Sequence, residues 1–187
     1  MTNYTEIDGI RTAYIEAGHG NDVVLMHGWG QNKEMMIHIF DHLKDRFHVI
    51  SIDFPGFGES DDPDEAWGVI EYEAYFAKFC DKLGLHNMIL IGHSFGCRVA
   101  IRYAADYSQN VKKMCLTGAA GIRPKHGLDW QIRTKTYKAG KWLLKVTGQN
   151  EKLEELQKNA GSEDYRNAKG IMKPTFVKVV NDDVSPV

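Results

Sequence analysis

The segment Gly92-His93-Ser94-Phe95-Gly96 places one serine between two glycines, each two positions away from it. An apolar run at 88–91 precedes the segment, and small and apolar residues suited to a helix follow it. A serine hydroxyl is a weak nucleophile, and a sharp turn between a strand and a helix is one way to raise its Oγ clear of a sheet. Side chains two positions before and after the serine would collide in such a turn, so glycine fits there. The pattern predicts Ser94 as a nucleophile.

A second segment, Leu25-Met26-His27-Gly28-Trp29-Gly30, closes another apolar run. Acyl transfer builds negative charge on a carbonyl oxygen. Preorganised backbone N–H groups stabilise that charge, each by roughly a few kcal/mol. The backbone N–H groups of Trp29 and Phe95 are the candidates for this oxyanion hole.

The elements that must position these residues alternate between two periodicities. Asp8-Gly9 is a favoured tight turn and predicts an N-terminal hairpin. Short apolar strands are expected at 22–28, 48–53, 87–92 and 111–118, and amphipathic helices at 33–44, 69–83 and 95–107. Beyond Gly121 only helices are expected, at 128–146, 151–160 and 171–180. Strands that alternate with helices indicate an α/β fold with a mostly parallel sheet covered on both faces.

Composition excludes several classes of function. The chain has 187 residues, 43% of them hydrophobic, and a formal net charge of -2, so it offers no excess positive charge for nucleic acid or an anionic membrane surface. The first residues lack the pattern of a signal peptide and no run is long enough to cross a bilayer, which predicts a cytoplasmic protein. Cys80, Cys97 and Cys115 stand singly, so no metal site, redox motif or cofactor is expected.

Three segments together resemble the α/β-hydrolase family, and specifically its lid-bearing members with a serine nucleophile. These are HGWG at 27–30, DFPGFGES at 53–60 and GHSFG at 92–96. The resemblance implies that the residues after His-Gly and after the serine, Trp29 and Phe95, supply the oxyanion hole. It implies that Asp53 is structural rather than the acid of a catalytic triad. It also implies a core over 1–121 and a helical lid over 122–187.

The resemblance further implies two later strands whose loops carry the triad aspartate and histidine, and the sequence stops at Val187 before either. We therefore expect no triad acid or histidine in this chain. His27 belongs to the oxyanion loop, and the turn at Ser94 directs His93 elsewhere. His126, near the entry to the lid, is the ambiguous candidate for a substitute base. Without the last two strands, residues 111–118 become a sheet edge, which favours self-association or pairing with a complementing C-terminal fragment.

The leading hypothesis is a serine hydrolase that acts on small apolar esters or related acyl compounds through an acyl-enzyme, catalytically incomplete in this chain. Serine at position 94 argues against dehalogenase or epoxide hydrolase chemistry, which family members perform through a carboxylate. A non-catalytic module that binds a small apolar molecule is the alternative from another class. Acyl transfer and hydrolysis of carbon–carbon bonds share the same motifs and stay open.

Overall fold

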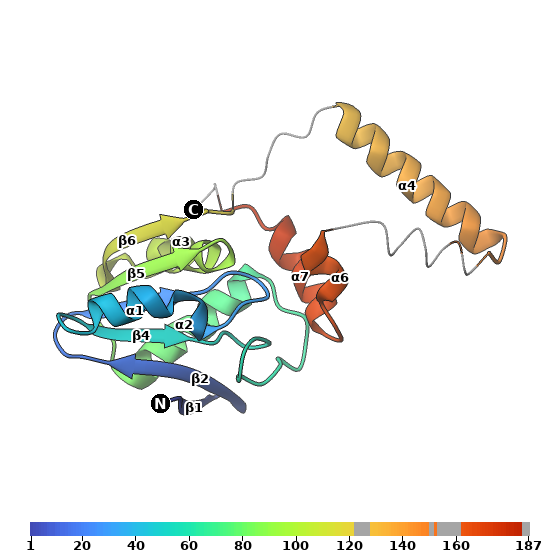
Figure 1. The fold of residues 1–187 in the computed structure, drawn as a ribbon. Coiled ribbons are helices and arrows are strands. Elements are labelled where there is room, and N and C mark those ends of the chain that lie inside the picture. Colours follow the sequence, from blue (N-terminus) through green and yellow to red (C-terminus); the bar gives the residue numbers. More distant parts are fainter. Residues whose placement is uncertain (122–127, 150–151, 153–161, 185–187) are drawn as a thin grey trace. The chain divides into compact units, whose positions relative to one another are not determined.

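The computed structural model describes residues 1–121, 128–149, 152 and 162–184, and its centre is a six-stranded sheet (Figure 1). The strand order is β1-β2-β4-β3-β5-β6, with two antiparallel pairings at the β1–β2–β4 side and parallel pairings from β4 to β6. The strands are β1 Asn3–Ile7, β2 Ile10–Ala17, β3 Asp22–Met26, β4 His48–Ile52, β5 Met88–His93 and β6 Val111–Thr117. The predicted mostly parallel sheet with its N-terminal hairpin is confirmed.

Helices cover both faces of this sheet because its inner strands are apolar on both faces. Alternate side chains of a strand point to opposite sides. Val24 and Met26 of β3 belong to a large apolar cluster with helices α2 and α3, whereas Val23 and Leu25 face a smaller cluster that includes Phe40 of α1. The helices of this part are η1 Lys33–Met36, α1 Ile37–Leu43, α2 Val69–Leu83, α3 Phe95–Asp106 and the short η2 Ser108–Asn110.

Strand β6 forms the edge of the sheet beside β5, and the described residues contain no strand beyond it. Most of its side chains are exposed, and Met114 is 42% exposed. A parallel strand is normally covered on both faces. The expectation of an uncovered edge at 111–118 is therefore confirmed for the part of the chain that the structure describes.

The chain divides into two compact units, Met1–Ile122 with Ala168–Val187, and Arg123–Asn167. Helix α7, Met172–Asn181, belongs to the first unit and buries Phe176 and Val179. The second unit contains α4, Leu128–Val146, and α6, Glu163–Asn167. The helix expected at 151–160 lies outside the described residues apart from Lys152, and the division into core and lid stays a prediction. None of the described helices combines the length and apolarity that crossing a bilayer requires.

Candidate active site at the ends of β3 and β5

Ser94 occupies a strained turn between β5 and α3. Its backbone has φ 48° and ψ −104°, a region that residues with a side chain rarely adopt. The turn is held from outside, because Ser94 N–H donates to the carbonyl of Thr117 at 3.1 Å. Strain of this kind costs about 1–3 kcal/mol and persists where the surroundings enforce it. The half-buried serine thus has the strained backbone that the sequence predicts for this turn, and its role as a nucleophile stays a prediction.

The two flanking glycines permit this turn because backbone passes close to both. A Cβ at Gly96 would lie 2.2 Å from the carbonyl oxygen of Met26, and a Cβ at Gly92 would lie 2.9 Å from the amide nitrogen of Cys97. Real Cβ atoms do not approach backbone that closely. The collision expected from the sequence is therefore present, with the end of β3 as the obstacle at Gly96.

Two backbone N–H groups near Ser94 stay available for a ligand. Helix α3 starts with unsatisfied amides, as every helix does. Gly96 N–H donates to His27 O and Cys97 N–H to Ser94 O, each at 3.1 Å, but no acceptor for Phe95 N–H occurs among the described residues. The same holds for Trp29 N–H, on the loop that follows the neighbouring strand β3. Their role as an oxyanion hole stays a prediction.

An aromatic cluster surrounds the half-buried Trp29. Its ring centroid lies 4.9 Å from that of Phe57, 5.7 Å from Phe95 and 5.1 Å from Phe176, all at steep interplanar angles. Phe57 and Phe176 were not expected here from the sequence. Phe57 lies in the 53–60 loop, and Phe176 comes from α7, where helical periodicity indicates a buried face without naming its partner. The cluster makes the wall beside Trp29 apolar.

His27 is unable to act as the base for Ser94. Its Nδ1 lies 2.7 Å from Gly28 O, and its Nε2 accepts the N–H of Phe54 at 3.1 Å, so both ring nitrogens are occupied. Burial lowers the pKa of this imidazole to about 4, against a smaller opposing effect of the Gly28 hydrogen bond. The expectation that His27 serves the loop rather than proton transfer agrees with this geometry.

His93 follows Gly92 directly, yet its ring is turned toward β6. Its Nδ1 lies 3.2 Å from Thr117 Oγ1, and its Cε1 would lie 3.1 Å from a Cβ at Gly118. No hydrogen bond joins Ser94 Oγ to an imidazole or carboxylate in the part of the chain that the structure describes. His126 lies outside that part.

Asp53 is fully buried and its carboxylate is committed to the loop. It accepts hydrogen bonds from the backbone N–H of Lys33, from Lys33 Nζ at 3.0 Å and from Glu59 N–H at 2.9 Å. Burial alone would lower the pKa of Lys33, but hydrogen bonds to Glu59 and Asp53 outweigh it and raise that pKa. Lys33 was not expected at this position, because an isolated lysine at the start of a helix resembles a surface residue.

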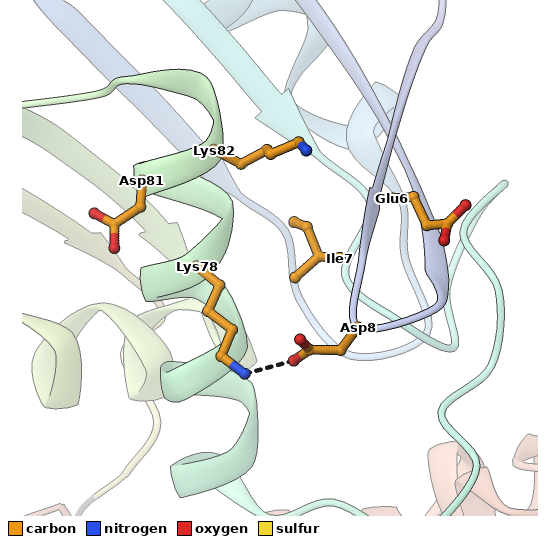
Figure 2. Close-up of a pocket in the computed structure, with 6 residues that line it drawn as sticks. All are labelled: Glu6, Ile7, Asp8, Lys78, Asp81 and Lys82. Atoms are coloured by element: carbon orange, nitrogen blue, oxygen red, sulfur yellow. Dashed lines mark hydrogen bonds and ion pairs between the residues drawn. The ribbon is translucent and has the colours of Figure 1, made fainter.

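One open hollow lies between the β1–β2 turn and helix α2 (Figure 2). Glu6, Ile7 and Asp8 line one side of it and Lys78, Asp81 and Lys82 line the other, and Lys78 Nζ lies 2.6 Å from Asp8 Oδ2. These residues include neither Ser94 nor the two amide candidates. Among the described residues, no group of three or more His, Cys, Asp and Glu side chains is suited to a metal ion.

Comparison with known proteins identifies the family of this fold. The family model described as "alpha/beta hydrolase fold" matches residues 22–171. The chain is 36% identical over 123 residues to a 1-acylglycerol-3-phosphate O-acyltransferase of Arabidopsis thaliana. This match covers 60% of this chain and 28% of that protein. It is 32% identical over 122 residues to a 2-hydroxy-6-oxo-2,4-heptadienoate hydrolase of Pseudomonas putida, which covers 61% of this chain and 43% of that protein.

Among solved structures, a bacterial membrane phospholipase A superposes with a TM-score of 0.65 at 29% identity. The match covers 68% of this chain and 42% of that one. The curated relatives in these comparisons are matched over 28 to 46% of their own length. The chain therefore spans less than half the length of these curated relatives.

Proposed function

Because the chain belongs to the alpha/beta hydrolase fold family, we propose that Ser94 is the nucleophile of an acyl-enzyme reaction on small apolar esters or related acyl compounds. The observation that carries the proposal is the strained backbone of Ser94, with φ 48°, at the junction of β5 and α3. Two amide N–H groups that have no acceptor among the described residues, on Trp29 and Phe95, lie on the segments that follow β3 and β5.

In this reaction Ser94 Oγ attacks the acyl carbonyl carbon, and a base takes the hydroxyl proton. The carbonyl oxygen becomes an oxyanion, to which Trp29 N–H and Phe95 N–H donate. The C–O bond to the alcohol breaks, and the alcohol leaves with the proton. Water then attacks the acyl-enzyme and releases the acid. The aromatic cluster around Trp29 supports a substrate whose acyl group is apolar.

We propose that neither the base nor the triad acid is part of this chain, which makes the chain catalytically incomplete by itself. His27 and His93 are both directed elsewhere by hydrogen bonds. We assign their supply to a complementing C-terminal segment that adds beside the exposed edge of β6. Residues 122–187 are proposed as the lid, and the contact between Phe176 and Trp29 supports a position of α7 next to the acyl group.

Transfer of the acyl group to another alcohol is a second candidate, because one relative is named as an O-acyltransferase and another as a hydrolase. Both reactions share the acyl-enzyme and differ only in the acceptor that attacks it. The alternative from a different class is a binding module that holds a small apolar molecule and does not react with it.

The test mixes the chain with a C-terminal fragment of the Pseudomonas putida relative and measures hydrolysis of a short nitrophenyl ester. We expect activity in the mixture that falls about a thousandfold or more in Ser94→Ala. Ser108→Ala, at an exposed serine on η2, is the matched control and keeps full activity. Activity that survives Ser94→Ala overturns the proposal. Saturable binding of the ester without turnover in any mixture favours the binding module.

A further inference from the structure

The Gly28–Trp29 peptide unit contains both the carbonyl that His27 touches and the amide proposed for the oxyanion hole. No cis peptide bond occurs among the described residues, and in a planar trans unit the C=O and N–H point to opposite sides. A group that holds Gly28 O therefore also fixes the direction of Trp29 N–H. His27 Nδ1, 2.7 Å from that oxygen, is the nearer of two such groups, and the backbone N–H of Gln31, at 3.2 Å, is the other.

The partners of His27 define its tautomer. A backbone amide only donates, so Nε2, which faces Phe54 N–H at 3.1 Å, carries no proton. A backbone carbonyl only accepts, so the proton of the neutral ring is on Nδ1 and is donated to Gly28 O. Both nitrogens of a neutral imidazole are satisfied in this one arrangement.

The ring is held rigidly in that arrangement. The residue is 1% exposed, and its centroid lies 5.5 Å from that of Phe54 and 5.3 Å from that of Phe57, edge to face in both pairs. The His27 carbonyl accepts Gly96 N–H of α3 at 3.1 Å. One residue thus joins the loop after β3 to the 53–60 loop and to the helix that begins after Ser94.

We propose that the neutral imidazole of His27 is a positioning residue, which aims Trp29 N–H at the oxyanion by holding the carbonyl of the same peptide unit. The inference rests on the proposed function, since it concerns the oxyanion hole of that reaction. His27 itself touches neither the substrate nor the reacting atoms. Its effect is on the transition state, where the oxyanion forms, rather than on binding of the neutral ester.

Two substitutions separate the two hydrogen bonds of the ring. In His27→Asn, the side-chain amide nitrogen occupies the place of Nδ1 and donates to Gly28 O. In His27→Gln, the longer side chain reaches the place of Nε2 and accepts from Phe54 N–H. Gly28 O then loses its imidazole donor and keeps only the backbone N–H of Gln31, at 3.2 Å. With the complementing fragment present, we expect kcat to fall about a hundredfold in His27→Gln, as on loss of one oxyanion donor, with KM little changed. His27→Asn retains at least about ten times the kcat of His27→Gln. Equal kcat losses in the two variants overturn the inference.

A second measurement uses the chain alone and does not depend on activity. In ¹⁵N NMR of the wild-type chain at neutral pH, we expect a protonated Nδ1 and an unprotonated Nε2 for His27. The Trp29 amide resonance shifts in His27→Gln, whereas that of Phe95 keeps its position. A wild-type ring protonated at Nε2 overturns the inference, and this measurement does not depend on whether any variant folds. A Trp29 amide resonance that does not move in folded His27→Gln also overturns it. Activity that survives Ser94→Ala overturns the proposed function instead, and the NMR result then decides the positioning of Trp29 by itself.

Discussion

Lys33 Nζ lies 3.0 Å from Asp53 Oδ2 in a place that water does not reach, with side-chain exposures of 2% and 0%. Asp53 also receives two backbone N–H groups, from Lys33 and Glu59. The recorded hydrogen bonds of this carboxylate therefore join the 53–60 loop to Lys33 and fix Glu59 within the loop. Asp53 therefore helps to position Phe54 and Phe57, which belong to the same loop, beside Trp29 and His27.

Asp53→Asn is expected to destabilise the fold by up to about 3–5 kcal/mol, because it removes the buried carboxylate beside Lys33 Nζ and leaves that charge paired only with the partly exposed Glu59. Chemical denaturation of the chain measures the loss. Glu59→Gln is the control: Glu59 Oε1 also pairs with Lys33 Nζ, at 2.6 Å, but its side chain is 48% exposed. A loss as large in Glu59→Gln as in Asp53→Asn would contradict the special role of the buried carboxylate.

Phe176→Ala is expected to lower the free energy of unfolding by about 3 kcal/mol, as for other buried phenylalanines, because its ring packs on Trp29 from α7. Val177→Ala, at the next position and 43% exposed, changes stability by less than about 0.5 kcal/mol. Thermal unfolding followed by Trp fluorescence reports both. Similar small effects in the two variants would show that α7 does not pack against Trp29 in solution.

The exposed edge at β6 predicts self-association of the chain without a partner, since unpaired strand edges recruit other chains. Light scattering over a range of concentrations should show species larger than the monomer. Met114→Lys, which places a charge on the edge strand, reduces association, whereas Val177→Lys, at a position of similar exposure on α7, does not. A monodisperse wild-type monomer at all concentrations would contradict this prediction.

Acid should destabilise the chain through His27. Burial lowers the pKa of its imidazole to about 4, below the usual value of about 6.5. Between these values the unfolded chain binds a proton that the folded chain does not, so this contribution to stability is complete above pH 6.5 and is lost as pH falls to 4. The loss amounts to about 3 kcal/mol. His27→Asn removes this titrating group, so the free energy of unfolding decreases less steeply from pH 7 to pH 4 in that variant. Parallel curves would refute this assignment.

The elements around the site follow from the sequence because local pattern determines them. Apolar residues at all positions of Val23–Met26 predict a strand buried on two faces, and both apolar clusters confirm it. The glycines at 92 and 96 predict the close approach that the backbone shows. Spacing along the chain is sufficient information for these features.

The contacts that join distant segments do not follow in this way. Phe176 reaches Trp29 from a helix far along the chain, and an amphipathic pattern indicates a buried face but not what covers it. The sequence places His27 in the oxyanion loop, yet its tautomer depends on the Phe54 amide of another loop. Lys33 pairs with Asp53 only after β4 has been placed beside β3. Such pairings are properties of the tertiary structure.

The most direct test of the central claim is peptide mapping by mass spectrometry after treatment with a fluorophosphonate. We predict one phosphonylated residue, Ser94, labelled slowly in the chain alone, faster after addition of the complementing C-terminal fragment, and unlabelled in Ser94→Ala. Prompt stoichiometric labelling of Ser94 in the chain alone would contradict the absence of a base and point to a substitute such as His126. A label on another residue, or one that persists in Ser94→Ala, would contradict the assignment of Ser94 as the nucleophile.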